Sequence, residues 1–232
     1  MIAPILPPGC QTIILVGGTF DPVHLAHTSL PRAARAAAHL DDACLLYVPA
    51  ARSPFKADAP RASDADRIAM LSLAIRSVPQ SAIWTDEIDR ARTSNAPSYT
   101  IHTLHRLRAA VAPPTDLRLL IGADQAASFH KWSDPRAILA LARPLVMLRG
   151  GDSTTVLGSL EASGFWTPDE LAMWSRSVVP TPLSSISSTH LRDLLATSDP
   201  ASEQQLAESL DPAVLEHIRS RGLYRRENRV IR

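Results

Sequence analysis

Two histidines, His24 and His27, have the residue type and spacing in this chain that best suit chemistry on phosphates. At positions i and i+3 they lie on the same face of a helix, where both imidazoles can donate hydrogen bonds to phosphate oxygens. The pair Gly17-Gly18 stands a few residues upstream, and adjacent glycines let a backbone turn sharply and approach a ligand closely. Together these residues predict a phosphate site, with a nucleotide as the expected ligand.

The segments on either side supply the elements that would position the histidines. Residues 12–16 are an apolar, partly β-branched run of buried-strand length, and residues 30–38 are strongly helix-forming. The predicted order is therefore strand, glycine turn, helix, and the start of the helix offers unpaired N–H groups to an anion. A plain βα turn without a ligand remains an alternative for the glycine pair.

Zinc binding is another alternative for the two histidines, but it fits the sequence less well. The His-Glu-x-x-His spacing is absent, and neither cysteine of the chain lies nearby. The turn also matches neither the G-x-G-x-x-G fingerprint nor the G-x-x-x-x-G-K-[ST] loop, which argues against a dinucleotide oxidoreductase and a P-loop protein. The sequence singles out no metal-ligating residue.

A second candidate phosphate motif lies far downstream, at residues 185–192. Arg192 follows Ser188 by four residues, so the two lie on one face of the predicted helix, one turn apart. Hydroxyls, helix N–H groups and a guanidinium could there converge on one polyphosphate. Redundant helix capping by the hydroxyls is the alternative interpretation.

Taken whole, residues 17–27 resemble the Gly-Gly-x-Phe-x-Pro-x-His-x-Gly-His signature of the nucleotidylyltransferase superfamily, and residues 185–192 resemble its Ile-Ser-x-Thr/Ser-x-x-Arg signature. The residues of these motifs are most similar to those of bacterial nicotinate-nucleotide adenylyltransferases. The resemblance runs from about Ile13 to Tyr224, apart from a segment after Gly151. Ala26 stands where the signature has glycine, and we expect the site to tolerate it, because a helical first turn needs no positive φ.

The resemblance implies roles for residues along the whole chain. It assigns catalytic roles to three residues, His24, His27 and Arg192. It assigns ATP binding to a larger set, which consists of Gly17, Gly18, Thr19, Phe20, Gly122, Asp124, Ser187, Ser188 and Thr189. It assigns binding of the second substrate to Lys56, Tyr99, Thr100 and Trp132. In that role Trp132 would stack on the pyridine ring of the substrate, and backbone N–H groups near Thr100 would bind the carboxylate on that ring. Phe55 replaces a histidine that is usual before the lysine.

From sequence alone, several of these residues could have a purely structural or solvent-exposed role without binding a ligand. Lys56 could be a solvated charge in the proline-rich loop 50–60, and Trp132 could be a core or rim residue. Asp124 could be a helix N-cap, although it follows a predicted strand whose carboxyl end is where open α/β sheets bind ligands. Ser98 is expected to be the N-cap of the helix 101–110.

Strands alternate with helices along the rest of the chain. Further strands are expected at residues 43–48, 83–85, 117–121, 145–148 and 176–179, with 86–90 as the polar exit of 83–85. Further helices are expected at 67–75, 101–110, 185–196 and 212–221. This order predicts a Rossmann-like, doubly wound parallel sheet with C-terminal helices. We expect one domain, 1–232, with a variable insertion at about 151–175 and a helical segment at about 185–224.

Composition limits the partners and the compartment. The 232 residues are 45% hydrophobic and 20% charged with a net charge of +1, which argues against disorder and against a nucleic-acid partner. No apolar run reaches the roughly 18 residues of a membrane helix, and the proline-broken start makes a poor signal peptide. Cys10 and Cys44 form no pairing pattern, which favours a reducing compartment, so we expect a cytoplasmic protein. The oligomeric state stays open, a homo-oligomer included.

The reaction implied by the resemblance is the transfer of the adenylyl group of ATP to nicotinate mononucleotide, with Mg²⁺ bound together with ATP. It gives nicotinate adenine dinucleotide and pyrophosphate, a step of NAD synthesis. Nicotinamide mononucleotide and phosphopantetheine are alternative acceptors. From a different class, a nucleotide-binding regulator that has lost catalysis, or a generic α/β interaction module, is the remaining alternative.

Overall fold

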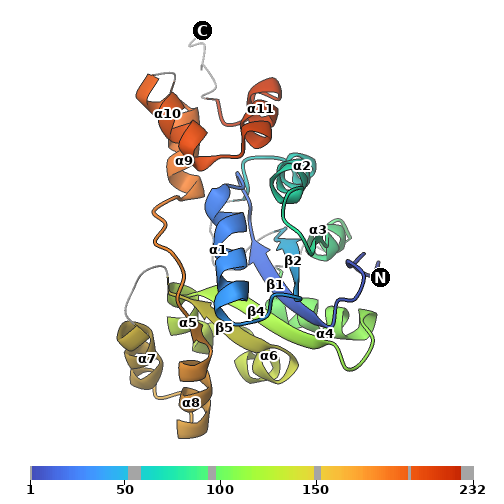
Figure 1. Ribbon diagram of the computed structural model, residues 1–232, viewed down its shortest axis with the longest axis vertical. Helices are drawn as coiled ribbons and strands as arrows, with labels where there is room; N and C mark the ends of the chain where they lie inside the picture. Colours follow the sequence, from blue (N-terminus) through green and yellow to red (C-terminus); the bar gives the residue numbers. More distant parts are fainter. Residues whose placement is uncertain (1, 52–58, 94–97, 149–152, 198–199, 226–232) are drawn as a thin grey trace.

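A six-stranded, entirely parallel sheet forms the centre of the molecule (Figure 1). The computed structural model describes residues 2–51, 59–93, 98–148, 153–197 and 200–225. Within them the strands stand in the order β3-β2-β1-β4-β5-β6. Their bounds are β1 Thr12–Gly18, β2 Cys44–Pro49, β3 Ser81–Ile83, β4 Asp116–Gly122, β5 Arg143–Met147 and β6 Val178–Val179. The expected doubly wound parallel sheet is confirmed.

The order of the strands reverses beside β1. The chain runs outward from β1 through β2 to β3 and then returns to β4 on the other side of β1, so Val16 pairs with both Tyr47 and Leu120. In open parallel sheets this reversal leaves a crevice at the carboxyl ends of the two strands, because the following connections leave toward opposite faces. The turn after β1 and the turn after β4 therefore meet at one place.

Helices cover both faces of the sheet (Figure 1). Those that contribute to one core cluster are α1 (Leu25–Ala37), α2 (Asp64–Ile75), α9 (Ser188–Leu195), α10 (Pro200–Ser209) and α11 (Pro212–Ser220). Those that contribute to the other are α4 (Thr100–Ala110), α5 (Ala123–Ala127), α6 (Pro135–Leu141), α7 (Ser153–Ala162) and α8 (Pro168–Arg176). Successive strand residues alternate between the two clusters, Ile14 in the first and Leu15 in the second, as the period of a strand requires.

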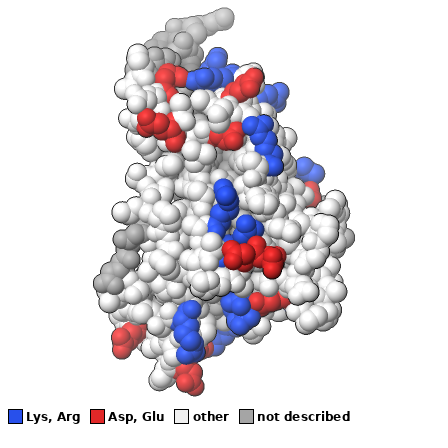
Figure 2. All heavy atoms as spheres, viewed as in Figure 1, with Lys and Arg blue, Asp and Glu red and all other residues white. Residues whose placement is uncertain are grey.

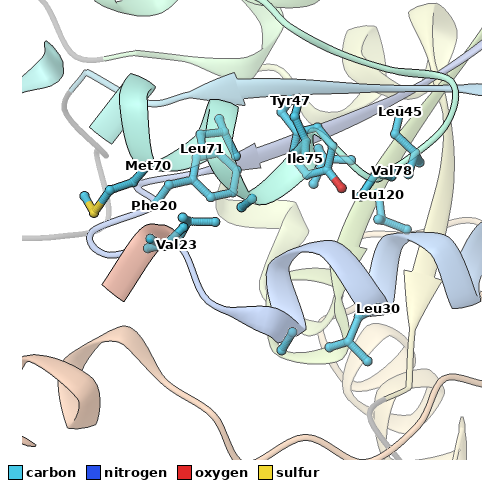
Figure 3. Packing of buried hydrophobic residues seen from close by; sticks show 14 of the residues in the cluster. Phe20, Val23, Leu30, Leu45, Tyr47, Met70, Leu71, Ile75, Val78 and Leu120 are labelled. Atoms are coloured by element: carbon cyan, nitrogen blue, oxygen red, sulfur yellow. The ribbon is translucent and has the colours of Figure 1, made fainter. Parts of the chain in front are cut away.

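The first core cluster includes the turn that follows β1. Figure 3 shows Phe20 and Val23 of this turn packed near Tyr47 of β2 and near Met70 and Leu71 of α2. All five side chains are at most 1% exposed. Their burial stabilises the turn by removing a large apolar area from water, and it fixes the residues that come between them.

Several elements differ from the expectations. Helix α1 begins at Leu25, at the helix entry where the sequence places the two histidines, whereas residues 86–91 form a helix, α3 (Asp86–Ala91), rather than a polar exit. Acidic residues occupy the first turn of α3, where the helix dipole favours negative charge. Strand β3 ends at Ile83, and the N-cap of α4 is Tyr99 rather than Ser98, whose hydroxyl bonds the side chain of Glu87 instead.

The segment expected to be a variable insertion contains α7 and α8. Trp166 and Trp174, in and beside these helices, are buried in the second core cluster. Their ring centroids lie 5.4 Å apart, and that of Trp174 lies 5.1 Å from Phe129. At the other end of the chain, α11 begins with Pro212 and is followed by Gly222 at φ +63°, as the sequence predicts.

The two cysteines form a disulfide, Cys10–Cys44, with their Cα atoms 5.8 Å apart. The expectation of unpaired cysteines was wrong, because Cys10 stands two residues before the start of β1 and Cys44 opens the neighbouring strand β2. Parallel pairing thus brings together two residues that no local pattern connects. Within the described ranges, no helix is long and apolar enough to cross a bilayer.

Candidate active site

A cleft of about 430 Å³ lies at the carboxyl ends of β1 and β4, a size suited to a small-molecule ligand. It brings together most of the residues that the sequence nominated. These are Gly17, Gly18, Thr19, His24, His27, Tyr99, Thr100, Asp124, Trp132, Ser187, Ser188 and Thr189. The two phosphate motifs, which lie far apart in the sequence, therefore line the same cleft.

The start of α1 holds the two histidines against each other. His24 is the N-cap residue and His27 stands three residues on, and their imidazole centroids lie 3.7 Å apart with the rings stacked. The backbone N–H of His24 donates to Nδ1 of His27 over 3.1 Å. A neutral imidazole has one donor and one acceptor nitrogen, so this bond leaves Nε2–H as the donor of the His27 ring. His27 is thus oriented to offer a proton to an anion.

The glycine pair has a different use at each position. A Cβ atom added at Gly17 would meet nothing within 4 Å, and Gly17 lines the cleft. A Cβ added at Gly18 would come within 2.9 Å of the ring of Phe20. Phe20 itself is buried, has φ 51° and contacts the edge of the His27 ring at 5.1 Å. Phe20 therefore packs against His27 from the protein interior and does not line the cleft.

Asp21 joins the turn to the rest of the molecule. Its side chain, 4% exposed, accepts hydrogen bonds from the backbone N–H groups of Arg61 and Ala62 and from the hydroxyl of Tyr224, the last at 2.7 Å. Burial and this bond to a carboxylate raise the pKa of the Tyr224 hydroxyl far above its ordinary value. The turn is thereby fixed from the C-terminal segment of the chain.

Arg67, fully buried on α2, fixes the other side of the turn. Its guanidinium donates to the carbonyl oxygens of Thr19 and Ala50, at 2.7 and 2.8 Å, and pairs with Asp64. It thus links the end of β1, the end of β2 and the start of α2. Sequence reasoning missed Asp21 and Arg67 as positioning residues, because their partners in other elements lie 17 to 203 residues away.

The second phosphate motif contacts the first directly. The hydroxyl of Ser188 donates to the carbonyl oxygen of Pro22 over 3.0 Å, and the guanidinium of Arg192 donates to the carbonyl of Asp21 over 2.6 Å. Arg192 also donates to the hydroxyl of Thr189, at 3.1 Å. The Arg192 side chain, 17% exposed, thus stands behind the cleft wall and is not among the lining residues.

The far end of the cleft is lined by the start of α4 and by an aromatic ring. Tyr99 and Thr100 bring the N-terminus of α4 to the wall, and Trp132 stacks on Phe129 with a centroid distance of 4.7 Å. Glu87, buried on α3, also lines this end. Its burial raises its pKa. Sequence reasoning missed Glu87, since it assigned residues 86–90 to an exposed exit.

The outcome differs among Gly122, Asp124, Lys56 and Ala26. Gly122 is the N-cap of α5, its N–H donates to the side chain of Gln125 over 3.1 Å, and it does not line the cleft. Asp124 stands in the first turn of that helix, so it is not the cap, and it does line the cleft. Lys56 lies outside the described residues. Ala26 sits inside α1 without a positive φ, which is the backbone conformation expected at this position, and tolerance of alanine by the site stays a prediction.

The cleft therefore offers hydrogen-bond donors at one end and an aromatic side chain at the other. Imidazoles, hydroxyls and the N-termini of α1 and α9 gather at the first end, and each can donate hydrogen bonds to an anion. Trp132 and the start of α4 form the second. This is the arrangement of a nucleotide-binding protein at the reversal point of a parallel sheet.

Comparison with known proteins places this cleft in a family. Residues 15–194 match the model of the cytidylyltransferase-like family, to which the chain belongs. A protein of Chromobacterium violaceum named "Probable nicotinate-nucleotide adenylyltransferase" is 36% identical over 217 residues, which cover 90% of this chain and 96% of that protein. A protein of the same name from Stenotrophomonas maltophilia is 35% identical over 222 residues, covering 91% and 96%. The chain is accordingly a member of the nicotinate-nucleotide adenylyltransferases.

Solved structures show the same fold. The nicotinic acid mononucleotide adenylyltransferase of Plasmodium falciparum, in its complex with NaAD, superposes with a TM-score of 0.64 at 15% sequence identity. That alignment covers 92% of this chain and 97% of the other. At so low an identity the likeness supports the fold of the chain, and the site must be argued from its own residues.

Proposed function

We propose that the protein transfers the adenylyl group of ATP to nicotinate mononucleotide, giving nicotinate adenine dinucleotide and pyrophosphate in NAD biosynthesis. The observation that carries the proposal is the meeting of two remote phosphate motifs in one cleft, where Ser188 bonds Pro22 beside His24. The names of relatives that span nearly the whole chain support the choice of substrates.

The nucleophile in this reaction belongs to the substrate. A phosphate oxygen of the mononucleotide attacks the α-phosphorus of ATP, and the bond from that phosphorus to the bridging oxygen of the β-phosphate breaks. The protein must align these groups and stabilise charge on the departing pyrophosphate. We assign this role to Nε2–H of His27, to His24 and to the hydroxyls and N–H groups at the start of α9.

Arg192 acts in this proposal from the edge of the cleft. Its bonds to Asp21 and Thr189 hold the start of α9 against the turn, and its positive charge stabilises a nearby polyphosphate. Trp132 supplies a face for the pyridine ring, and the first N–H groups of α4 at Thr100 face its carboxylate. Gly17 and Thr19 let the phosphates approach the turn.

Mg²⁺ in this proposal arrives with ATP. Among the described residues no group of three or more metal-ligating side chains comes together. Mg²⁺ on nucleotides is held mainly by phosphate oxygens and water with one or two carboxylates, and Asp124 on the cleft wall suits that part. The donor set therefore fits a substrate-borne ion, which would neutralise charge on the leaving pyrophosphate.

We also propose that the chain forms a single domain. We place the protein in the cytoplasm, since ATP is its substrate. The Cys10–Cys44 disulfide does not support that compartment, because such bonds are typical of oxidising ones. Light scattering of the purified protein would settle whether it is a monomer or a homo-oligomer.

The test is pyrophosphate release from ATP with nicotinate mononucleotide, nicotinamide mononucleotide or phosphopantetheine as acceptor. We expect the fastest turnover with the nicotinate form. Faster turnover with phosphopantetheine or with the amide would replace the acceptor in the proposal. Binding of ATP without pyrophosphate release from any acceptor would instead favour a regulator.

A further inference from the structure

We infer that Glu87 is a positioning residue for the end of the cleft that takes the pyridine ring. The inference rests on the proposed function and deepens it. Glu87 is the second residue of the short helix α3 and is 8% exposed, yet it lines the cleft beside Ser98, Tyr99 and Thr100. A buried carboxyl at a binding site requires partners, and its partners lie on both sides of the start of α4.

The hydrogen bonds of Glu87 fix the start of α4 from two directions. The hydroxyl of Thr103, on the first turns of α4, donates to Oε1 of Glu87 over 2.7 Å. Ser98, which immediately precedes Tyr99, hydrogen-bonds the same carboxyl. One side chain therefore holds both the loop that leads into α4 and the helix itself, and the segment between them is the part that lines the cleft.

This attachment matters because α4 has no side-chain cap of its own. Its N-cap residue, Tyr99, makes no capping hydrogen bond. The first N–H groups of any helix lack partners within the helix, so a helix start is a place where a carboxylate can be read. The direction of these donors is set by the backbone at Ser98 and Thr103, both of which Glu87 holds.

Charged side chains beside Glu87 make further contacts between α3 and α4. Arg90 donates to the hydroxyl of Thr103 over 3.1 Å and to Asp86 over 3.0 Å, and Arg106 of α4 donates to Asp86 over 2.7 Å. Asp86 is as buried as Glu87, but it faces away from the cleft and is absent from its wall. Asp86 thus offers a matched control: a buried carboxyl of α3 that also joins α4 but does not touch Ser98.

The experiment compares steady-state kinetics of wild type, Glu87→Ala, Glu87→Gln, Ser98→Ala and Asp86→Asn on ATP and nicotinate mononucleotide. For Glu87→Ala we expect kcat/KM for the mononucleotide to fall by about tenfold to a hundredfold, the usual loss when a supporting residue behind a ligand contact is removed. The KM for ATP should stay within about twofold, because the phosphate end of the cleft rests on other residues. The ratio of kcat/KM for nicotinate mononucleotide to kcat/KM for nicotinamide mononucleotide should fall.

The other variants separate positioning from folding. Glutamine can accept from Thr103 and donate to Ser98, so Glu87→Gln should recover most of the lost kcat/KM. Ser98→Ala removes one hydroxyl at the rim of the cleft and should raise the KM for the mononucleotide even where Glu87→Ala folds poorly. Asp86→Asn should leave that KM unchanged.

Each outcome decides between the two claims. Equal losses toward ATP and the mononucleotide in Glu87→Ala, or an unchanged mononucleotide KM in both Glu87→Ala and Ser98→Ala, would overturn the inference and leave the proposed function standing. A wild-type enzyme that does not turn over nicotinate mononucleotide would overturn both.

Discussion

Replacing His27 by alanine perturbs the centre of the phosphate end of the cleft. The fold loses an acceptor for the N–H of His24 at 3.1 Å and an edge contact with the ring of Phe20 at 5.1 Å. Loss of a helix-capping bond costs about 1 kcal/mol and loss of an aromatic contact about 0.5–1.5 kcal/mol. Native domains are stable by about 5–15 kcal/mol, so His27→Ala should remain folded.

The effect on turnover should be larger than the effect on stability. In the proposed mechanism Nε2–H of His27 donates to phosphate oxygens whose charge grows in the transition state. Removing one such fixed donor typically lowers kcat by about a hundredfold to a thousandfold, or about 2.7–4 kcal/mol of barrier. The KM for either substrate should change much less, because the lost interaction is strongest in the transition state.

Continuous pyrophosphate release measures kcat, and urea denaturation measures the free energy of unfolding. His190→Ala is the matched control, since His190 lies in the second motif but its ring contacts Gln205 at 3.3 Å and does not line the cleft. We expect His190→Ala to stay within about threefold of wild type. A kcat for the folded His27→Ala variant within fivefold of wild type would remove His27 from the mechanism, and an unfolded variant would contradict the stability estimate.

Three further predictions concern the surroundings of the cleft. Tyr224→Phe deprives Asp21 of a charge-assisted donor and should lower the free energy of unfolding, measured in urea, by about 1.5–3 kcal/mol; an unchanged value would refute the role of this contact. Asp66 accepts from Ser63 and His217, and chiefly its bond to Ser63 lowers its pKa, so its contribution is present near neutral pH and is lost on acidification. The stability difference between wild type and Asp66→Asn, about 1 kcal/mol at pH 7, should therefore begin to fall at about pH 4, the ordinary pKa of an unfolded aspartate, and should vanish only below the lowered pKa of Asp66 in the folded protein; a constant difference would contradict this linkage. EDTA should abolish pyrophosphate release, and excess Mg²⁺ restore it, while the melting temperature of the substrate-free protein stays unchanged; a drop in that temperature would point to a structural metal.

The elements that carry a strong local pattern were predictable. Alternating strand and helix patterns predicted the parallel sheet, because the strands are short apolar runs and the helices α2, α9 and α11 have recognisable start signals. Ser63 caps α2 through the N–H of Asp66, and Pro212 and Gly222 bound α11, which are local signals for the ends of a helix. The two phosphate motifs were also visible, since each lies within a dozen residues.

The tertiary structure decided how these residues are used. Phe20 is a buried support and Arg192 is bonded to the turn, although the motif places both with the nucleotide. Glu87 is buried at the cleft, although it stands in the mostly acidic segment 86–89.

Sequence by itself determined the strands, several of the helices and the two motifs that could hold phosphates, because those properties depend on residues within a turn or two of one another. The folded structure alone decided the pairing of Cys10 with Cys44, the contacts of Asp21 with Tyr224 and the burial of Glu87. These depend on the direction in which a side chain points and on what packs against it from another part of the chain, and a linear pattern contains neither.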